Sequence, residues 1–335
     1  MIAKSDSSNV IGFGLVGFGR FCQNRLIPAF RQTNNARISA IWKRSKSEAE
    51  AEAQKYGIPA GYGDLSDLLK HPGVDAVYVT SANNMHEAHV IAAAKAGKHV
   101  LCEKPLSITA ESCLRIVESC NKANVKLMVA HNLRYSEAIL EIKRISSSGQ
   151  LGEVVSGSTV FTYDGSKSPR SWLYDPHLAG GGAMIDIGVH CLDTLRFLLG
   201  EIVEVQSMLD PPKSQNRIEE STQVNLRFAS GALGSILCSY KSPYYSRLEI
   251  QGSAGRALVE PFTLPEKDVL VKVERNGSYE GIPLNTGNSY SRMIEAFSAS
   301  IQEDNPAPIP GEEGLINQTI IDQVYSDQDI GKFSK

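Results

Sequence analysis

The first half of the chain alternates short apolar runs with longer stretches in which apolar residues recur at helical spacing. The apolar runs, each typical of a buried strand, cover residues 10–16, 37–42, 74–80, 99–102 and 125–130. Helical patterns of about 10–15 residues separate most of these runs, which predicts βαβ units with right-handed crossovers in a parallel sheet.

Helix boundaries in this half are predicted from individual residues. Ser47 and Glu50 have the spacing of a capping box, so a helix is expected to open at Ser47. Gly97 stands where a helix ending at Ala96 needs a residue that tolerates the left-handed conformation. Further helices are expected over residues 109–123 and from beyond Asn132 to about residue 149.

From Gly152 the pattern changes to runs with a period of two, which is typical of strands that bury one face of a sheet. These runs cover residues 154–163, 222–228, 233–240, 247–251 and 269–273. They predict an antiparallel sheet with one open side, and self-association is the simplest way to cover that side. Helical patterns return over residues 290–302 and 312–325, and the sequence leaves open on which half the first of them packs.

Length and composition narrow the class of protein. A chain of 335 residues is too long for one ordinary core, so two domains are expected. The net charge of -3 and the lack of a Lys/Arg-rich block give no electrostatic footprint for nucleic acid. No window approaches the roughly 18 apolar residues of a membrane span, and the polar N-terminus lacks a signal peptide's apolar region, so a cytoplasmic protein is expected. The six cysteines form no C-x-x-C pair and are expected to be buried free thiols.

The first strand is followed by Gly17-Phe18-Gly19-Arg20-Phe21, in the order of strand, glycine turn and helix that a dinucleotide site requires. Gly17 permits the tight turn, and Gly19 lets the backbone approach a pyrophosphate, which the free N–H groups of a helix N-terminus attract. The same residues also fit an ordinary glycine turn.

Two details bear on this motif. Cys22 replaces the third glycine of the dinucleotide pattern but is small enough for close helix packing. A second register, Gly12-x-Gly14-x-x-Gly17, is disfavoured because polar residues precede it and two glycines would fall in the first helical turn.

The second strand ends in Lys43-Arg44-Ser45. An NAD site normally has an acidic residue here for the ribose 2′-hydroxyl, whereas a basic residue accommodates the 2′-phosphate of NADP. Lys43 and Arg44 therefore favour NADP(H) over NAD(H). The alternative is a pair of solvated charges at a strand end.

Two further groups of residues could carry chemistry. Lys104 follows an apolar strand, at the carboxyl end where ligands bind in a doubly wound sheet, although Glu-Lys pairs are also common as solvated ions. Asp186 and His190 are four apart, so a helix would bring them to one face, where a carboxylate beside an imidazole suits proton transfer. The alternative for His190 is a core histidine. No third ligand at suitable spacing is evident, so no metal site is predicted.

Taken together, these motifs resemble the Gfo/Idh/MocA oxidoreductase family. The resemblance rests on Gly17-Phe-Gly19, Asn83-x-x-His86, Glu103-Lys104-Pro105 and Gly180-Gly-Gly-x-x-x-Asp186-x-Gly-x-His190-x-x-Asp193. It implies an α/β protein with an N-terminal Rossmann domain, a doubly wound parallel sheet, at residues 1–131. Residues 132–335 would form an α+β domain for substrate binding and oligomerisation, with a large, open, mostly antiparallel sheet and last helices that can pack back on the Rossmann domain.

The resemblance also implies an activity. Enzymes of this family move hydride between a nicotinamide and a carbon bearing a hydroxyl or carbonyl, mostly on sugars, sugar derivatives and cyclitols, and assemble as dimers or tetramers through the sheet. Lys104, Asp186 and His190 match the catalytic set, and family members differ on whether the lysine or the histidine is the immediate base. The peptide bond between Lys104 and Pro105 is expected to be cis. Two alternatives remain within the family: a nicotinamide-dependent glycosidase acting by transient oxidation and elimination, and a non-catalytic cofactor-sensing protein.

The predicted contacts follow from these motifs. The cofactor-binding residues are expected to be Gly17, Phe18, Gly19, Arg20, Phe21, Lys43, Arg44, Ser45, Ser81, Asn83, His86, Glu103 and Lys104. The substrate-binding residues are expected to be Lys104, Arg134, Tyr135, Tyr163, Arg170, Trp172, His177, Asp186 and His190, because they flank the motifs and can hydrogen-bond or stack on a sugar ring. Those outside the catalytic set fit a structural role equally well.

Overall fold

The computed structural model describes residues 10–214, 216–263, 268–285 and 287–326. The chain forms two compact units. Unit 1 comprises residues 1–130 and 290–315, and unit 2 comprises residues 131–289 and 316–335. Each unit is therefore assembled from two separate segments of the sequence.

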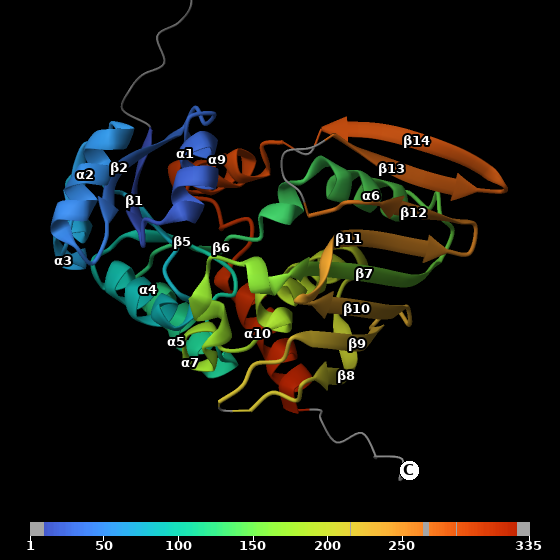
Figure 1. Cartoon of the computed structure of the whole chain (residues 1–335). Coiled ribbons are helices and arrows are strands. Elements are labelled where there is room, and N and C mark those ends of the chain that lie inside the picture. The colour runs from blue at the N-terminus through green and yellow to red at the C-terminus, as the bar shows by residue number, and fades with distance from the viewer. Residues whose placement is uncertain (1–9, 215, 264–267, 286, 327–335) are drawn as a thin grey trace, which may run out of the picture. The chain divides into compact units, whose positions relative to one another are not determined.

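Unit 1 contains a six-stranded sheet with the strand order β3-β2-β1-β4-β5-β6 (Figure 1). Its strands are β1 (Ile11–Val16), β2 (Ala36–Trp42), β3 (Ala60–Tyr62), β4 (Ala76–Val79), β5 (His99–Cys102) and β6 (Leu127–Val129). All neighbouring pairs are parallel, and the strand order reverses at β1, as in a doubly wound nucleotide-binding fold. The predicted parallel sheet is confirmed, whereas β3 was missed because three residues carry too short a pattern.

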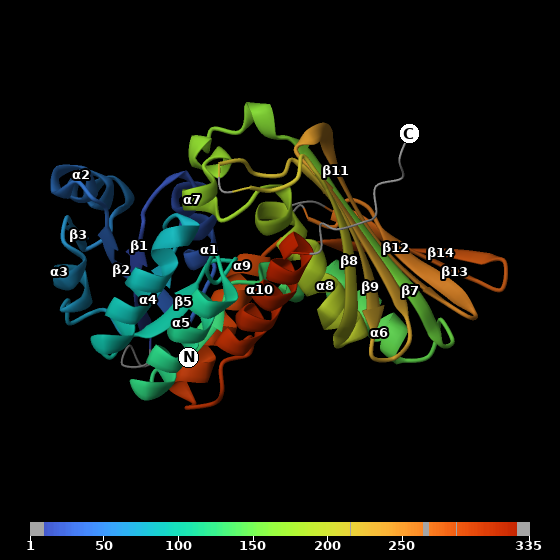
Figure 2. The same ribbon diagram turned by 90° about the horizontal axis from the view of Figure 1, so that it is seen from below.

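Most helices of unit 1 lie between these strands in the sequence, whereas the last two come near the end of the chain. These helices are η2 (Cys22–Leu26), α1 (Ile27–Phe30), α2 (Lys46–Tyr56), α3 (Leu65–Leu69), η3 (Asn83–Met85), α4 (His86–Lys95), α5 (Ala110–Lys122), α9 (Ser289–Gln302) and the start of α10 (Gly311–Ser326). Figures 1 and 2 show α4 and α5 side by side, and Glu87 of α4 accepts a hydrogen bond from Ser112 Oγ of α5 at 2.6 Å. Gly97 follows α4 with a φ of 72°, as predicted.

Helix α2 begins before the expected position. Its N-cap is Ser45, whose Oγ accepts a hydrogen bond from the Glu48 backbone N–H at 3.3 Å. The capping box predicted at Ser47 was therefore wrong, because either serine can cap and the observed start places Ala49 and Ala53 on the buried side of the helix.

Strand β1 is buried on both faces, which are filled in different ways. The Phe13 ring lies 5.2 Å from the Phe30 ring of α1 and 6.3 Å from the Phe297 ring of α9. Helix α9 therefore packs within unit 1. On the other face the backbone approaches closely, since a Cβ on Gly12 would collide with the carbonyl oxygen of Gly73. Gly12 and Gly14 belong to the strand, so the second glycine register is not the turn motif, as predicted.

Unit 2 contains an eight-stranded sheet with the order β14-β13-β12-β11-β7-β10-β9-β8 (Figure 1). Its strands are β7 (Val154–Asp164), β8 (Ile202–Asp210), β9 (Ser221–Phe228), β10 (Leu233–Ser239), β11 (Lys241–Gly252), β12 (Gly255–Val259), β13 (Asp268–Arg275) and β14 (Ser278–Asn285). Strands β7 and β10 are parallel, and the other neighbours are antiparallel. The predicted large, mostly antiparallel sheet is confirmed.

Helices cover one face of this sheet. Unit 2 contains η4 (Asn132–Tyr135), α6 (Glu137–Ser147), η5 (Gly165–Lys167), η6 (Ser171–Tyr174), α7 (Pro176–Ala179), η7 (Met184–Gly188), α8 (Val189–Leu199) and the rest of α10. Ile139 and Ile142 of α6 and Leu192 and Leu195 of α8 share one buried core with Ile250 of β11. This burial, at about 1.5–3 kcal/mol for each large apolar side chain, fixes both helices on the sheet.

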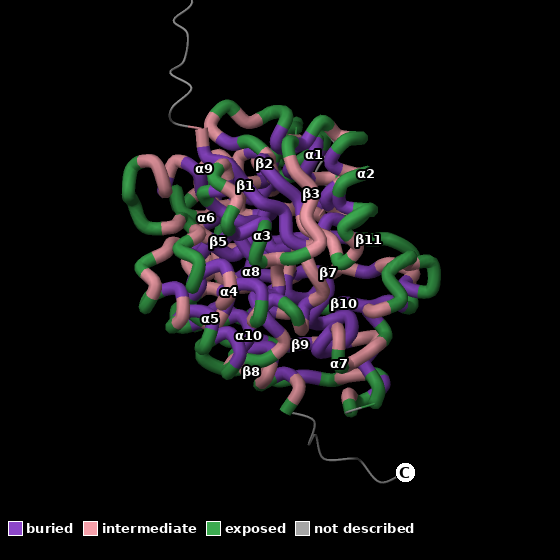
Figure 3. The backbone as a smooth tube through the Cα atoms, turned by 90° about the vertical axis from the view of Figure 1, so that its left-hand side faces the viewer, coloured by how far each residue is buried: buried purple, intermediate pink, exposed green. Residues whose placement is uncertain are grey.

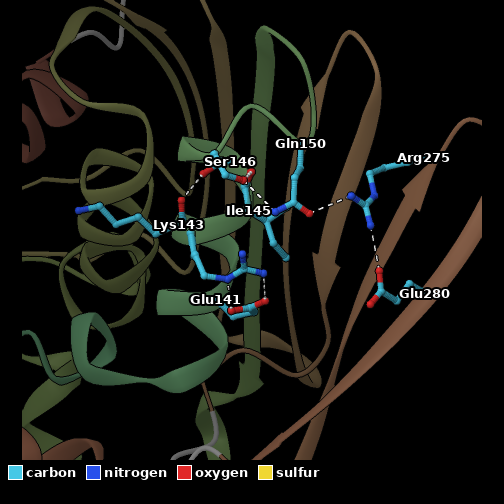
Figure 4. Close-up of polar contacts among 9 residues, drawn as sticks. Glu141, Lys143, Ile145, Ser146, Gln150, Arg275 and Glu280 are labelled. Atoms are coloured by element: carbon cyan, nitrogen blue, oxygen red, sulfur yellow. Dashed lines mark hydrogen bonds and ion pairs between the residues drawn. The ribbon is translucent and has the colours of Figure 1, made fainter.

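Polar contacts connect the turn after α6 with β13 and β14 (Figure 4). Arg275 donates from Nη1 to Gln150 Oε1 at 2.8 Å and from Nη2 to Glu280 at 2.9 Å. Glu141 and Arg144 form an ion pair at 2.6 Å along α6 itself. These groups are partly exposed, so each pair contributes only about 0–1 kcal/mol, and the apolar core positions the helix.

Burial is concentrated in the strands and the helix faces that cover them (Figure 3). All six cysteines are free and buried, which confirms the prediction made from their spacing. Within the described ranges, no helix combines the length and hydropathy needed to cross a membrane.

Candidate functional site

The turn after β1 requires glycine at its first position. Gly17 has a φ of 98°, and a Cβ there would lie 2.8 Å from the backbone nitrogen of Ser81. Gly19 faces open space, since the nearest atom to an added Cβ would be 3.9 Å away. An open backbone directly before a helix fits the pyrophosphate of a dinucleotide.

Cys22, at the third position of the glycine pattern, is a packing group. Its Sγ lies 3.2 Å from Thr80 Oγ1, and Thr80 Oγ1 donates to the Gly17 carbonyl oxygen at 3.1 Å. Burial raises the pKa of Cys22 to about 11, so the thiol stays protonated at neutral pH. These contacts connect the turn after β1 to the end of β4.

Two glycine substitutions are expected to separate folding from cofactor binding. Gly17→Ala introduces strain and a backbone contact, which is expected to cost about 1–3 kcal/mol and to lower the Tm. Gly19→Ala has room within the protein but places a methyl group against a bound pyrophosphate, so the Kd for the cofactor rises about tenfold with little change in Tm. Thermal denaturation and fluorescence titration with reduced cofactor measure the two effects. Equal Tm losses in both variants would contradict this division.

Two basic residues directly follow β2. Lys43 is 21% exposed and forms an ion pair with Glu48 of α2, with Nζ and Oε2 2.9 Å apart. Arg44 is exposed, and Ser45 caps α2. No acidic residue occupies positions 43–45, but Glu48 partly neutralises one of the two positive charges.

His86 is buried between the segments that follow β4 and β5. Its Nδ1 lies 2.9 Å from the Pro105 carbonyl oxygen and its Nε2 lies 3.0 Å from the Ser81 carbonyl oxygen. Burial lowers the pKa of His86 to about 4, against the raising effect of these carbonyl groups. The neutral ring lies between the segment after β4 and the one that contains Lys104, and its single N–H donates to one of the two carbonyl oxygens.

Glu103 and Lys104 stand directly after β5, as predicted, and the Lys104–Pro105 peptide bond is cis, as the family resemblance implies. The Tyr78 hydroxyl donates to Glu103 Oε1 at 2.7 Å. Burial raises the pKa of Glu103 to about 7, while the charge of Lys104 and the Tyr78 hydrogen bond oppose the shift. The neighbour of Lys104 is thus a carboxyl group that titrates near neutrality.

The remaining predicted cofactor residues lie close to these segments in the sequence. Phe18 and Asn83 are buried, and Arg20 is exposed. Phe21 is partly exposed, with its ring 5.7 Å from that of Tyr290. Their contacts with a cofactor stay predictions.

In unit 2, two predicted residues meet at the carboxylate of a third. Tyr163 of β7 donates its hydroxyl to Asp186 Oδ2 at 3.0 Å, and Arg170 donates to both carboxylate oxygens at 3.2 Å. Asp186 is 5% exposed, whereas the Arg170 side chain is 45% exposed. Burial and the charge of Asp186 raise the pKa of Tyr163. The result is a charge-balanced group of donors and acceptors that reaches the surface of unit 2 at Arg170.

Asp186 and His190 lie on one continuous helical segment, as predicted. Asp186 is in η7, a π-helical turn, and His190 is in α8, which continues it. π-Helical turns are rare in proteins, and those that occur are often found at functional sites. Residues four apart still fall on the same side of such a segment. His190 is partly exposed, with its ring centroid 6.4 Å from that of Phe161 in β7.

Arg134 is held by a buried carboxylate. Its Nε and Nη2 donate to the two oxygens of Asp193 at 3.0 and 2.7 Å, and Asn317 Nδ2 donates to Asp193 Oδ1 at 3.0 Å. Burial alone would raise the pKa of Asp193, but His131, Arg134 and Asn317 together lower it. This bidentate pair fixes the guanidinium, and a substrate contact of Arg134 stays a prediction.

The other predicted substrate residues have different environments. Tyr135 and Trp172 are partly buried, and burial raises the pKa of Tyr135 to about 12. His177 is exposed in α7, where its backbone N–H donates to Asp175 at 2.9 Å. Their contacts with substrate stay predictions.

Three polar residues beside these groups were missed in the sequence. Tyr78 lies in an apolar run, yet a buried tyrosine hydroxyl usually has a partner, and this was a usable signal. Tyr240 stacks on Tyr163 with ring centroids 5.1 Å apart. Glu219 is fully buried, although two adjacent glutamates in the sequence are more typical of a solvated surface.

Two protein-family models match the chain. The model described as "Oxidoreductase family, NAD-binding Rossmann fold" matches residues 11–131, and the "GFO/IDH/MocA C-terminal domain" matches residues 139–258. The chain belongs to the Gfo/Idh/MocA family. The family predicted from the motifs is thereby confirmed, and so is the class of nicotinamide-dependent oxidoreductase.

Several Gfo/Idh/MocA proteins are similar over nearly their whole length. The 1,5-anhydro-D-fructose reductase of Ensifer adhaerens is 29% identical over 90% of this chain and 92% of its own. A D-xylose 1-dehydrogenase (NADP(+)) of Haloferax volcanii is 29% identical over 95% of this chain and 98% of its own. The crystal structure of an aldose-aldose oxidoreductase from Caulobacter crescentus has a TM-score of 0.88 at 27% identity, over 95% of this chain and 97% of that one.

Proposed function

We propose that this family member transfers hydride between a nicotinamide cofactor and a hydroxyl or carbonyl carbon of a sugar, sugar derivative or cyclitol. The observation that carries the proposal is the buried carboxylate of Asp186, bonded by Tyr163 and Arg170, on the same helical segment as His190. Together these groups offer donors and acceptors to a polyhydroxylated ligand. The sugar substrates in the names of the three relatives support the same class.

Each residue has a defined role in this proposal. A bound nicotinamide supplies or accepts the hydride. His190 exchanges the proton of the reacting hydroxyl, because imidazole titrates near neutrality. Lys104 donates a hydrogen bond to the reacting oxygen and stabilises its developing negative charge, and Asp186 orients substrate and imidazole.

A substrate panel tests the proposal. Aldoses, keto-sugars, inositols and anhydrosugars are each incubated with NAD(H) and NADP(H), and the absorbance of the reduced cofactor is followed. Turnover with a net change in absorbance supports the dehydrogenase or reductase. Release of product from a glycoside without net change would indicate a glycosidase, and cofactor binding without turnover would indicate a sensing protein.

The preference for NADP(H) rests on Lys43 and Arg44, and one substitution tests it. Lys43→Glu is expected to weaken NADPH binding about 10–100-fold, since a charge-assisted bond to the 2′-phosphate becomes a repulsion. NADH binding should change much less. The matched control is Lys46→Glu, an exposed lysine that pairs with Glu50 on α2. Tighter binding of NADH than of NADPH by the unchanged protein would show that this preference is wrong.

We also propose self-association through the open face of the unit 2 sheet, as a dimer or tetramer. Met208 and Leu237 both lie opposite Gln223 in register, so they share a face, and they are 65% and 39% exposed. Large exposed apolar side chains on a sheet face are typical of an interface. Leu237→Arg is expected to shift the protein towards a monomer in light scattering. A monomer before substitution would exclude the interface.

The cellular location is proposed on separate grounds. All six cysteines are free and buried, which favours a reducing compartment. We propose the cytoplasm.

A further inference from the structure

A buried glutamate outside the proposed catalytic set caps the helical segment that carries Asp186 and His190. Glu219 is fully buried. Its Oε2 accepts a hydrogen bond from the Gly182 backbone N–H at 3.0 Å, and its Oε1 accepts one from the Met184 backbone N–H at 2.8 Å. These donors lie at the N-terminus of the segment, where backbone N–H groups lack intrahelical acceptors. A carboxylate there is also favoured by the helix dipole.

The backbone before this segment approaches Glu219 and its partner Tyr325 so closely that only glycine fits. The Ala183 backbone N–H donates to the Glu219 carbonyl oxygen at 3.2 Å. A Cβ on Gly182 would collide with that carbonyl oxygen, and a Cβ on Gly181 would collide with the hydroxyl of Tyr325. Backbone and side chain of Glu219 thus hold the glycine turn on two sides.

The glycine turn is connected directly to Asp186. The Asp186 backbone N–H donates to the Gly182 carbonyl oxygen at 3.1 Å. The Tyr240 hydroxyl donates to the same carbonyl oxygen at 3.1 Å, and the Tyr240 ring stacks on Tyr163, which donates to Asp186. A shift of the turn at Gly182 would therefore move Asp186 and its partner together.

The Glu219 carboxylate has a third hydrogen-bond donor, a tyrosine hydroxyl. The Tyr325 hydroxyl donates to Glu219 Oε1 at 3.1 Å, and Lys213 Nζ lies 3.7 Å from the centre of the Tyr325 ring. Burial raises the pKa of Glu219, and the hydrogen bonds from Met184, Gly182 and Tyr325 oppose this shift. The carboxylate accepts three hydrogen bonds in the folded protein.

We propose that Glu219 is a positioning residue for the oxidoreductase reaction: its carboxylate clamps the Gly180–Met184 turn and so sets the place of Asp186 and His190. The inference rests on the proposed function for its kinetic consequence. The clamp itself is a property of the folded protein and is measurable without turnover.

The test is Glu219→Gln in the full-length protein. An amide of the same shape has one acceptor oxygen, so its NH2 group faces one of the two backbone N–H donors and leaves that donor unsatisfied. We expect kcat/KM for the substrate to fall about 10–100-fold, with KM raised threefold or more and the Kd for the cofactor unchanged. Hydrogen exchange of peptides covering residues 180–190 should become faster.

Two variants serve as comparisons. Glu220→Gln makes the same change in the next residue, whose partly exposed side chain pairs with Lys241, and should leave kinetics and exchange unchanged. Tyr325→Phe removes only the third hydrogen bond and should give a smaller change in the same direction. If Glu219→Gln fails to fold, Tyr325→Phe carries the test, and wild-type KM and exchange in that variant would overturn the proposal.

The outcomes distinguish a positioning role of Glu219 from a role in overall stability alone. A variant that merely unfolds more easily loses active molecules, which lowers the turnover per total protein but leaves KM unchanged. An unchanged KM with wild-type exchange over residues 180–190 in Glu219→Gln would overturn the proposal. A wild-type protein without turnover in the substrate panel would contradict the proposed function, while faster exchange in the variant would still establish the clamp.

Discussion

Replacement of Lys104 by alanine is expected to lower kcat by about 10²–10³-fold, the usual effect of removing one donor to a developing negative charge. Lys104 follows β5, beside the partly buried carboxyl group of Glu103, whose pKa is raised to about 7. The substitution removes the ammonium group and does not alter the groups that contact the His86 ring, the carbonyl oxygens of Pro105 and Ser81. Steady-state kinetics with the substrate found in the panel measure the loss.

The control for Lys104 is Lys122→Ala, which removes an exposed lysine from the last turn of α5. It should retain full turnover and the same Tm. The Lys104 variant should also bind reduced cofactor with a Kd within about fivefold of the original, since the glycine turn at Gly17 is untouched. Near-complete turnover in Lys104→Ala would remove this lysine from the mechanism.

Replacement of His190 by asparagine is expected to lower kcat by about 10²–10⁴-fold, the range for loss of a general acid–base group. Asparagine keeps a polar side chain of similar reach but cannot exchange a proton near neutral pH. The ring contact with Phe161 is lost as well, which should cost little because His190 is only partly buried. Turnover and thermal denaturation are measured together.

A comparison across variants distinguishes the two residues. If His190 is the immediate proton acceptor, the pH dependence of kcat/KM should lose one limb in His190→Asn and keep it in Lys104→Ala. The opposite pattern would assign that role to Lys104. A pH profile unchanged in both variants, with near-complete turnover, would exclude both as proton-transfer groups.

Much of the fold could be predicted because the chain's local patterns agree with its final structure. Strand β5 was predicted to the residue, since its apolar run is bounded by Gly97 on one side and by the charged Glu103 on the other. The sequence analysis missed β3, β8, β12 and β14. Strand β3 has only three residues, and β14 includes Gly281 and Pro283 and little apolar alternation. Their pairing depends on partner strands rather than on local sequence.

The site could be predicted only where its residues lie in short motifs. Lys104, Asp186 and His190 follow from contiguous segments, and the clustering of Tyr163 and Arg170 on Asp186 became visible only in three dimensions. Glu219 lies 37 residues from the Gly182 amide that it binds. No local pattern marks such a pair. Its contribution to stability depends on the burial of both groups, and the sequence does not specify burial residue by residue.

The division of unit 1 into two sequence segments has a consequence for synthesis on the ribosome. Tyr290 follows Ala130 by 160 residues, which at about 5–20 residues per second is a delay of roughly 10–30 s. Until then Phe13 lacks its contact with Phe297, and the β6 edge lacks the bond from the Val129 N–H to the Ile309 carbonyl oxygen. The nascent nucleotide-binding unit therefore keeps an uncovered sheet edge until its final segment has emerged from the exit tunnel.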